Sequence, residues 1–238
     1  MSKNYLVTII VITYNAEKHI EGVIESIKLR FNENTEVIIV DGLSTDETLN
    51  IVKKYGKYIT KVISEKDFGI YDAMNKGIAH SNGRFILFLG ADDKLAINLK
   101  ELASILVDDK TIYYGDVRLS PSDKIYGGKY TTAKLLNRNI CHQCILYPKK
   151  VFEEFQFGSS YKYMEDYVMN MKLWCSNSFT FHYINKTIAI YSTTGLSSTN
   201  LDTAYKKDSW NIIYKNFGFL GIVIKFFNPI RNFFIGLK

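Results

Sequence analysis

Apolar runs alternate with amphipathic stretches along the first ninety or so residues. Four runs rich in β-branched and other apolar side chains have the composition of buried strands. They lie at 6–12, 37–40, 59–63 and 85–89. Between them, apolar residues recur at helical spacing over 20–27 and 49–55. This alternation predicts an α/β domain with a largely parallel sheet and right-handed crossovers, of the type that binds nucleotides.

The fourth run ends in two adjacent acids. Residues 85–89 lead through Gly90 and Ala91 directly into Asp92 and Asp93. In open α/β sheets ligands bind beyond the carboxyl ends of such strands, and two carboxylates there suit a divalent cation together with a phosphorylated ligand. The alternative is that one of these acids caps a helix over 99–106.

Polar residues also follow the first two predicted strands. Thr13, Tyr14 and Asn15 come after the first strand, and the segment 41–46 (DGLSTD) comes after the second. Some of these side chains are suitable helix N-caps, and the glycine suits a turn. However, the carboxyl ends of parallel strands share one edge of a sheet, so an aromatic ring, hydroxyls and acids gather there. Such a gathering is typical of a nucleotide site.

The overall charge is moderately positive. The chain has 238 residues, of which 47% are hydrophobic, and 30 Lys and Arg against 24 Asp and Glu give a net charge of +6. No Lys/Arg-rich block suits a phosphodiester backbone, so no nucleic-acid partner is expected, and the excess favours a phosphorylated substrate or an anionic membrane surface. The N-terminal residues lack the pattern of a signal peptide, which predicts a cytoplasmic location.

The chain lacks both common phosphate-binding loops, because neither GxGxxG nor GxxxxGKS/T follows a predicted strand. A divalent cation, Mn²⁺ or Mg²⁺, is then the expected means of holding a diphosphate. Three cysteines do not make a disulfide framework. Cys141 and Cys144 have CxxC spacing, but no second pair completes a zinc site, so buried, unreactive thiols are expected.

Four ordered segments carry a family resemblance. They are 11–17 (VITYNAE), 40–48 (VDGLSTDET), 64–77 (SEKDFGIYDAMNKG) and 90–93 (GADD). In this order they resemble the donor half of an inverting family two glycosyltransferase with a GT-A fold, of the bacterial surface polysaccharide type. The resemblance implies a mostly parallel central sheet with helices on both faces.

The resemblance assigns the nucleotide to the strand ends, where Tyr14 would stack on the base and Asp41 would accept a base N–H. The implied donor-binding residues are Thr13, Tyr14, Asn15, Asp41, Ser44, Asp67, Gly69, Asp72, Asn75, Lys76 and Asp92. Asp93 is the implied main protein ligand of the cation, while Asp92 contacts the ribose or the metal. Many relatives have acids where this chain has Gly42 and Gly90, so weak, substrate-dependent metal binding is expected.

The second half supplies the expected catalytic base. Glu165 and Asp166 stand among aromatic residues, before a helix-like stretch over 168–174. The resemblance implies Asp166 as the base, with Glu165 orienting it or binding the acceptor. The alternative is a pair of acids that stabilises a helix N-terminus. His142 is expected to reach the acceptor pocket, the alternative being a histidine whose hydrogen bonds are satisfied within the protein. Residues 194–198 resemble a loop that closes over the diphosphate, although a plain surface loop would have the same pattern.

The C-terminal tail is basic and rich in phenylalanine from about Phe217. Charged residues and a proline interrupt its apolar positions, so it is too broken to span a bilayer. The pattern predicts two short amphipathic helices hinged near Asn228-Pro229. We expect residues 215–238 to lie on the inner face of the cell membrane. The alternative is a helix that packs on the catalytic domain or on the second subunit of a homo-oligomer.

The sequence therefore predicts a GT-A catalytic domain over 1–200, with a donor half (1–110) and an acceptor half (111–200), and a tail over 201–238. The predicted activity is metal-dependent transfer of a hexose or N-acetylhexosamine from a nucleotide sugar, expected to be a UDP-sugar, to a hydroxyl of a lipid-linked or growing surface glycan. One alternative is a sugar-nucleotide nucleotidyltransferase, although it would normally carry a glycine-rich, basic loop after the first strand. Another is a catalytically silent, membrane-attached scaffold of the same fold.

Overall fold

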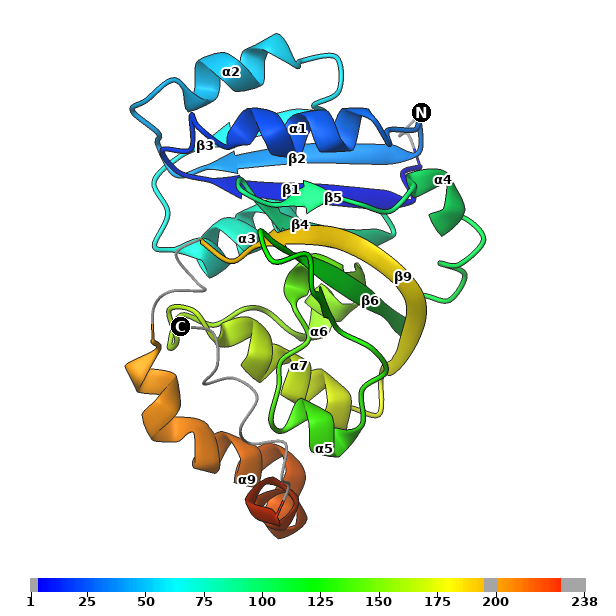
Figure 1. Ribbon diagram of the computed structural model, residues 1–238, viewed down its shortest axis with the longest axis vertical. Coiled ribbons are helices and arrows are strands. Elements are labelled where there is room, and N and C mark those ends of the chain that lie inside the picture. The colour runs from blue at the N-terminus through cyan, green and yellow to red at the C-terminus, as the bar shows by residue number, and fades with distance from the viewer. Residues whose placement is uncertain (1–3, 195–200, 228–238) are drawn as a thin grey trace.

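A nine-stranded mixed sheet forms the centre of the molecule (Figure 1). The computed structural model describes residues 4–194 and 201–227. The strands are β1 (Val7–Thr13), β2 (Thr35–Asp41), β3 (Lys61–Ser64), β4 (Phe85–Gly90), β5 (Lys94–Leu95), β6 (Thr111–Ser120), β7 (Ile125–Tyr126), β8 (Ile145–Pro148) and β9 (Thr180–Ser192). Their order across the sheet is β3-β2-β1-β4-β8-β6-β9-β5, and β7 pairs with β6 outside this path.

The helices are short in the body of the molecule and long at its C-terminal end. They are α1 (Ile20–Lys28), α2 (Thr48–Lys54), α3 (Ile70–His80), α4 (Leu99–Leu102), α5 (Thr132–Leu135), the 3-10 turn η1 (His142–Cys144), α6 (Val151–Glu154), α7 (Glu165–Cys175) and α9 (Thr203–Phe227). In the first half of the chain they alternate with strands, as the apolar pattern predicts.

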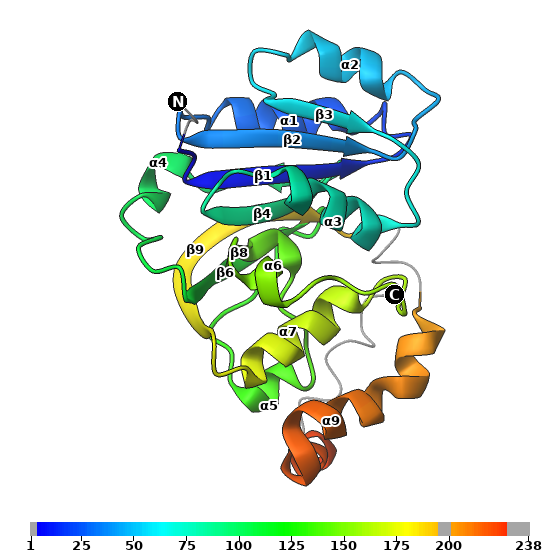
Figure 2. The same ribbon diagram turned by 180° about the vertical axis from the view of Figure 1, so that it is seen from behind.

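The first four strands of the chain form a parallel sheet, which confirms the prediction for this half. The apolar side chains of β1, β2 and β4 are buried, because α1 lies over one face of the sheet and α3 over the other (Figures 1 and 2). The register places Thr13 beside Asp41 and Ile12 beside Gly90. The carboxyl ends of these three strands therefore meet at one edge. The predicted strand 59–63 forms slightly later, as β3.

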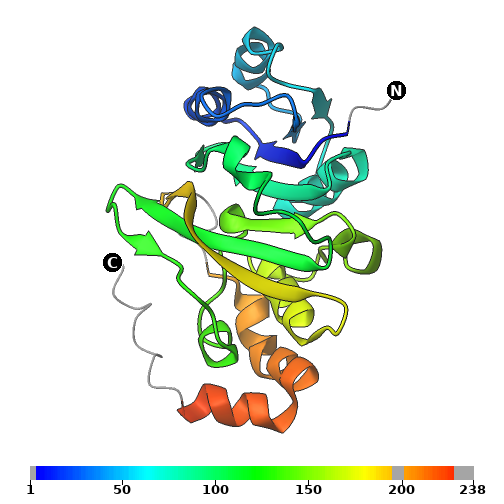
Figure 3. The ribbon, with the colours of Figure 1, turned by 90° about the vertical axis from the view of Figure 1, so that its right-hand side faces the viewer.

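The remaining strands run in mixed directions. β8 pairs antiparallel with both β4 and β6, so it joins the parallel strands to the rest of the sheet. β9 is a long strand that lies parallel to β6 through register shifts near Asp116, and its last part pairs with β5 (Figure 3). Strand β9 is long enough to bring the chain from the far side of the molecule back to the end of β4, where the Ser192 N–H donates to Asp93.

The helix predicted over 99–106 is shorter than expected, and neither adjacent acid caps it. α4 spans Leu99–Leu102, and Asn98 is its cap, because the side-chain oxygen of Asn98 accepts a hydrogen bond from the Lys100 backbone N–H at 3.1 Å. The N-cap alternative for Asp92 and Asp93 is therefore wrong. These two carboxylates are available for another role.

The C-terminal helix packs on the body of the molecule through one side. α9 contacts α7, and Ile212 and Ile213 are buried there. The helix breaks at Gly218, whose φ of 62° and ψ of −162° are not helical. The predicted hinge near Asn228-Pro229 lies outside the described residues, so the break within the described part falls ten residues earlier, at the glycine. Among the described residues, no helix is long and apolar enough to cross a membrane.

The contact between α3 and β1 depends on a glycine. A Cβ atom added at Gly77 would lie 2.5 Å from Cγ2 of Ile10, which is fully buried. We predict that Gly77→Val destabilises the protein by about 2–3 kcal/mol through overpacking. For a chain of this length that lowers Tm by about 2–4 °C per kcal/mol. Ala79→Val, at an exposed position of the same helix, is the matched control. Equal Tm values for the two variants in a thermal melt would contradict this account of the α3–β1 contact.

Candidate active site

Two polar atoms at the shared strand edge are buried without a partner among the described residues, namely Oδ1 of Asp41 and Oγ1 of Thr13. The other carboxylate oxygen of Asp41 accepts hydrogen bonds from the Ser44 backbone N–H at 3.0 Å and the Ser64 hydroxyl at 2.7 Å. These bonds fix the carboxylate and leave Oδ1 unused. Because a buried polar atom without a hydrogen bond costs stability, this pair fits contact with a ligand's polar groups.

The loops after β1 and β2 are joined by hydrogen bonds. The Asn15 backbone N–H donates to Oγ of Ser44 at 2.8 Å, and the Thr45 N–H donates to Oδ1 of Asn15 at 2.9 Å. Asn15 has a φ of 45°, a left-handed conformation that asparagine tolerates. The neighbouring Tyr14 is 62% exposed. These contacts hold an open aromatic ring beside Asp41, as base stacking requires.

Gly42 stands where many relatives have an acid, and Asp67 occupies the space there. A Cβ atom at Gly42 would overlap Oδ2 of Asp67 and would touch the Tyr14 ring at 3.4 Å. The other oxygen of Asp67 accepts a hydrogen bond from the Gly69 N–H at 3.0 Å. Asp67 thus brings a carboxylate next to the Tyr14 ring from the loop before α3.

The first turns of α3 hold the remaining predicted donor residues, but they do not all face the strand edge. The ammonium of Lys76 lies 3.2 Å from the carboxylates of both Glu65 and Asp72. The side-chain amide of Asn75 instead donates to the backbone carbonyl of Phe157 at 2.9 Å. The contact of Asn75 in the structure is therefore with the second half of the chain.

The acids after β4 differ in their surroundings. Asp93 is buried, and its carboxylate accepts hydrogen bonds from the Gly90 N–H (2.8 Å), the Gln143 side-chain amide (3.1 Å) and the Ser192 N–H (3.1 Å). Burial, and next the negative charge of Asp92, raise the pKa of Asp93 to about 6. Asp92 is half-buried and has no hydrogen-bond partner among the described residues.

This pair fits a divalent cation, with Asp92 as the open ligand. A Cβ atom at Gly90 would lie 3.0 Å from Oδ1 of Asp92 and 3.1 Å from Oδ2 of Asp93, so the glycine leaves room against both carboxylates. Asp93 accepts three N–H donors, two on Oδ2 and one on Oδ1, which leaves one lone-pair position on Oδ1, so its role as the main protein ligand stays a prediction. The described residues contain no cluster of three or more His, Cys, Asp or Glu that could hold a metal. A cation here would need further oxygens from a ligand.

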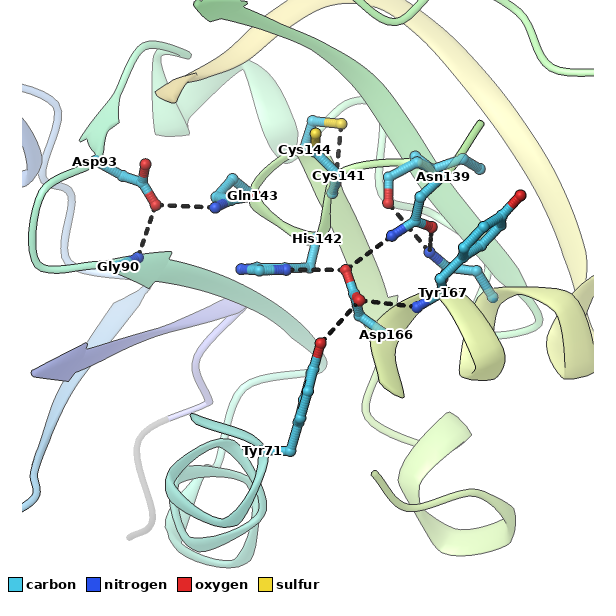
Figure 4. A network of polar contacts seen from close by, with 12 residues as sticks. Tyr71, Gly90, Asp93, Asn139, Cys141, His142, Gln143, Cys144, Asp166 and Tyr167 are labelled. Atoms are coloured by element: carbon cyan, nitrogen blue, oxygen red, sulfur yellow. Dashed lines mark hydrogen bonds and ion pairs between the residues drawn. The ribbon is translucent and has the colours of Figure 1, made fainter. Parts of the chain in front are cut away.

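Asp166 forms the centre of a buried polar network at the start of α7 (Figure 4). One carboxylate oxygen accepts from the Tyr71 hydroxyl at 2.9 Å and the Tyr167 N–H at 2.8 Å. The other accepts from the Asn139 side-chain amide at 2.9 Å and lies 3.1 Å from Nδ1 of His142. Burial and the nearby Asp166 keep the pKa of Tyr71 well above its ordinary value, so this phenol stays a donor.

Glu165 serves the loop that precedes α7. Its side chain is buried, and Oε1 accepts from the backbone N–H groups of Ser160 at 2.8 Å and Tyr161 at 2.9 Å. Among the described residues it makes no hydrogen bond to the Asp166 side chain, so its observed role is to shape the loop beside Asp166. The alternative of two acids that only stabilise a helix N-terminus does not account for the three donors and the imidazole of His142 around Asp166.

The turn η1 joins the two acidic sites through consecutive residues. His142 contacts Asp166, and the next residue, Gln143, donates to Asp93 (Figure 4). Sequence reasoning singled out His142 but missed Gln143, and it also missed Tyr71 and Asn139, which surround Asp166. The signal available for Gln143 was a pair of adjacent polar residues directly before the apolar run that becomes β8.

The cysteines belong to no group of three or more metal-ligating side chains among the described residues. All three are free thiols, and burial raises the pKa of both Cys141 and Cys144. Cys175 is exposed, contrary to the expectation of a buried thiol. Of the predicted diphosphate loop at 194–198, residues 195–198 lie outside the described residues.

Comparisons with known proteins identify the family. The model of Glycosyl transferase family 2 matches residues 8–167. A PGL/p-HBAD biosynthesis glycosyltransferase of Mycobacterium bovis is 31% identical over 210 residues, which are 84% of this chain and 82% of that protein. The UDP-Glc:alpha-D-GlcNAc-diphosphoundecaprenol beta-1,3-glucosyltransferase WfgD of Escherichia coli is 26% identical over 184 residues, covering 74% of this chain and 72% of WfgD.

A solved structure shares the fold. S. aureus TarS 1-349 in complex with UDP-GlcNAc matches with a TM-score of 0.72 at 21% sequence identity, over 98% of this chain and 76% of that one. At this identity the likeness concerns the fold, and it confirms the predicted GT-A architecture. Since the family model covers more than half of the chain, and a relative above 30% identity spans most of it, the chain belongs to glycosyl transferase family 2.

Proposed function

We propose that this glycosyltransferase moves a sugar, with inversion, from a UDP-sugar to a hydroxyl of a lipid-linked glycan in surface polysaccharide biosynthesis, with the help of a divalent cation. The observation that carries the proposal is that η1 links the acids after β4 to the buried Asp166 network through His142 and Gln143. A leaving-group site and a proton-accepting site thus lie next to each other, as a single displacement requires.

The donor nucleotide binds where β1 and β2 end. The unpartnered Oδ1 of Asp41 accepts a base N–H, and the exposed ring of Tyr14 stacks on the base. The names of two similar proteins support uridine as the base, because WfgD uses UDP-Glc and the TarS structure holds UDP-GlcNAc. The sugar that this chain transfers is a hexose or an N-acetylhexosamine.

The cation is held by Asp92 and by the diphosphate of the donor. Asp92 has a free carboxylate, whereas Asp93 is held by three N–H donors and positions the end of β4. When bound, a divalent cation neutralises charge on the leaving diphosphate. Only one open protein carboxylate is available at the described site, so its affinity for the cation is expected to depend on the nucleotide.

The acceptor hydroxyl reacts beside Asp166 and His142. A hydroxyl is a weak nucleophile until a positioned group accepts its proton, and the buried Asp166 network is the structure's candidate for that group. One displacement at the anomeric carbon inverts its configuration. Membership of the glycosyltransferase family replaces the nucleotidyltransferase alternative. A catalytically silent scaffold would bind no donor or would release no UDP, and the experiments below test both properties.

The last turns of α9 are the part of the described chain that we assign to the membrane surface. Phe219, Leu220, Phe226 and Phe227 are exposed, while Lys215 is exposed before the break at Gly218. An apolar surface with basic neighbours suits the boundary of an anionic bilayer. A lipid-linked acceptor of the kind in the name of WfgD is presented at such a surface.

Donor binding is the first test of the proposal. In a thermal-shift assay, UDP with Mn²⁺ at about 100 times its Kd should stabilise the protein by about 2.7 kcal/mol. We expect Asp41→Asn to lose most of this shift, because an amide at this position places an N–H donor or a neutral oxygen toward the base. Asp109→Asn, which removes a surface ion pair with Arg84, should keep it. No shift for the unaltered protein with UDP or with UDP-sugars would contradict the donor site.

The division of roles between the two acids is the second test. Asp92→Asn should remove the extra UDP stabilisation that Mn²⁺ provides, while leaving the Tm of the ligand-free protein nearly unchanged. Asp93→Asn should instead lower the ligand-free stability by about 1–3 kcal/mol, because an amide cannot satisfy three N–H donors as a carboxylate does. The opposite pattern, with Asp93→Asn abolishing only the Mn²⁺ effect, would restore Asp93 as the main ligand.

Membrane contact is the third test. The double variant Phe219→Glu with Leu220→Glu should co-sediment with vesicles of anionic phospholipid several-fold less than the unaltered protein, because two carboxylates then face the anionic surface. Leu29→Glu, a change at an exposed leucine that follows α1, is the control and should bind vesicles normally. Equal vesicle binding by the double variant and the control would mean that this surface does not contact lipid.

A further inference from the structure

Two residues of α3 hold the loop that precedes this helix. Oδ2 of Asp72 accepts a hydrogen bond from the backbone N–H of Phe68 at 3.0 Å, and the ammonium of Lys76, one turn later, lies 3.2 Å from the same carboxylate. The loop also carries Asp67, whose carboxylate lies next to the Tyr14 ring. These contacts attach the edge of the proposed nucleotide site to the first turns of α3.

Two other residues of the same turns contact the second half of the chain. Tyr71 donates its hydroxyl hydrogen to Oδ1 of Asp166 at 2.9 Å, and Figure 4 shows its side chain reaching Asp166 from α3. Asn75 donates from its amide to the carbonyl of Phe157 at 2.9 Å and accepts from the N–H of Phe157 at 3.3 Å. Asn75 thus binds both backbone groups of one residue, as a neighbouring strand would.

The contact between α3 and the second half is buried and closely packed. Tyr71 and Phe157 are each 4% exposed, and their ring centroids are 5.5 Å apart. The Phe157 ring also packs against Phe88 of β4 and against Phe152, at centroid distances of 5.7 Å and 6.0 Å. Aromatic rings at such distances attract each other, and a close-packed interior transmits displacement instead of absorbing it. A shift of α3 would therefore move the segment before α7 as well.

We propose that Tyr71 and Asn75 are positioning residues of the glycosyl transfer, which hold the base Asp166 at a fixed place relative to the loop 65–69 beside the nucleotide. The inference rests on the proposed function, in which Asp166 accepts the proton, and it assigns the groups that set the position of this acid. Residues 71 and 75 serve the base, and residues 72 and 76 serve the donor loop. Neither positioning residue has to touch a substrate. Reacting groups brought into the right geometry in advance lower the barrier of a displacement.

Tyr71 also acts on the charge of Asp166, whereas Asn75 does not. A hydrogen bond donated to an ionised carboxylate favours the ionised form, which is the form that can accept a proton. Burial and the nearby Asp166 hold the pKa of Tyr71 well above its ordinary value, so the phenol is a donor near neutral pH. Asn75 contacts the backbone of Phe157 instead. The two residues therefore differ in a measurable property, the pH dependence of turnover.

The other titratable groups near Asp166 stay the same when either residue is changed. They come from α7, η1, β8, α9 and the residue before η1, and they are Cys141, His142, Tyr147, Glu165, Tyr167 and Tyr205. Burial raises the pKa of the thiol and of the three phenols, so these groups are neutral in acid and at neutral pH. A change in the acid limb of the pH profile in one variant alone is then due to the hydrogen bond that this variant lacks.

Tyr71→Phe is the first variant, because it keeps the ring against Phe157 and removes only the hydroxyl. At neutral pH we expect kcat to fall by about 10–10²-fold. The acid limb of the kcat–pH profile should move by about one unit to higher pH, because the carboxylate is protonated more easily without this donor. The thermal shift with UDP and Mn²⁺ should be unchanged. The assay is UDP release from UDP-glucose or UDP-GlcNAc with an N-acetylglucosaminyl diphosphate lipid as acceptor.

The matched control is Tyr113→Phe. Tyr113 is a buried tyrosine of β6 whose hydroxyl accepts from the Asp108 backbone N–H at 3.2 Å, so this variant also loses one hydrogen bond of a buried phenol. We expect it to keep the kcat and the pH profile of the unaltered protein.

Asn75→Ala tests the position of the base without removing a donor from its carboxylate. We expect kcat to fall at least several-fold, while the acid limb and the thermal shift with UDP and Mn²⁺ stay unchanged. Asn50→Ala removes an exposed amide contact between Asn50 and Glu47 at α2, and this control should keep full turnover. If Tyr71→Phe does not fold, Asn75→Ala decides: loss of kcat with an intact UDP shift supports the proposal, and unchanged kcat overturns it.

The outcomes separate this inference from the function on which it rests. Turnover by the unaltered protein, together with equal kcat values in Tyr71→Phe and Tyr113→Phe, overturns the positioning role and leaves the glycosyltransferase proposal intact. A lower kcat in Tyr71→Phe with an unmoved acid limb, or loss of the UDP shift in this variant, also overturns it, since the effect would then come from destabilisation or from donor binding. No UDP release by the unaltered protein from either donor overturns both.

Discussion

The parallel pairing of β2, β1 and β4 is the constraint on which the site depends. Their side chains are almost entirely apolar and buried, so helices must cover both faces and each strand must be followed by a crossover. Apart from Thr8, Thr35 and Glu36 near the amino ends of β1 and β2, the polar side chains of these strands lie at the carboxyl ends. Because the register aligns Thr13 with Asp41 and Ile12 with Gly90, those ends form one polar edge. The hydrophobic interior thus determines where a nucleotide can bind.

The sequence predicted the first half of the fold well, because its determinants are local. Continuous apolar runs identify β1, β2 and β4, and helical spacing identifies α1 and α2. The weak third strand was displaced, α3 was not predicted as a helix, and the helix expected over 99–106 is only Leu99–Leu102. The second half depends on pairings over long separations, such as Asp93 with Ser192, which no local pattern reports. The hinge of the C-terminal helices was predicted near Pro229, because proline interrupts helices more strongly than glycine does. Within the described residues α9 is interrupted at Gly218 instead.

The site was predictable in its residue types and less so in their roles. The motifs located the acids at 92, 93 and 166, but neighbouring residues at a strand end meet different surroundings. The side chain of Asp93 is buried and hydrogen-bonded, whereas that of Asp92 is half-buried and makes no hydrogen bond among the described residues. The sequence of two adjacent aspartates does not reveal this difference. Asn75 matched a donor motif and yet contacts Phe157. Gln143 had no motif to mark it, because its partner lies fifty residues away.

The turn η1 fixes a length as well as a set of contacts. His142 contacts Asp166 and the next residue, Gln143, contacts Asp93. The two contacting residues are therefore held one peptide unit apart, which is about 3.8 Å between Cα atoms. The turn thus sets the spacing between the two acidic sites. Insertion or deletion of one residue there would prevent His142 from contacting Asp166 while Gln143 contacts Asp93, even if every side chain were kept. Loops that only line the acceptor side are under no such restriction, and their lengths are free to diverge as acceptors change.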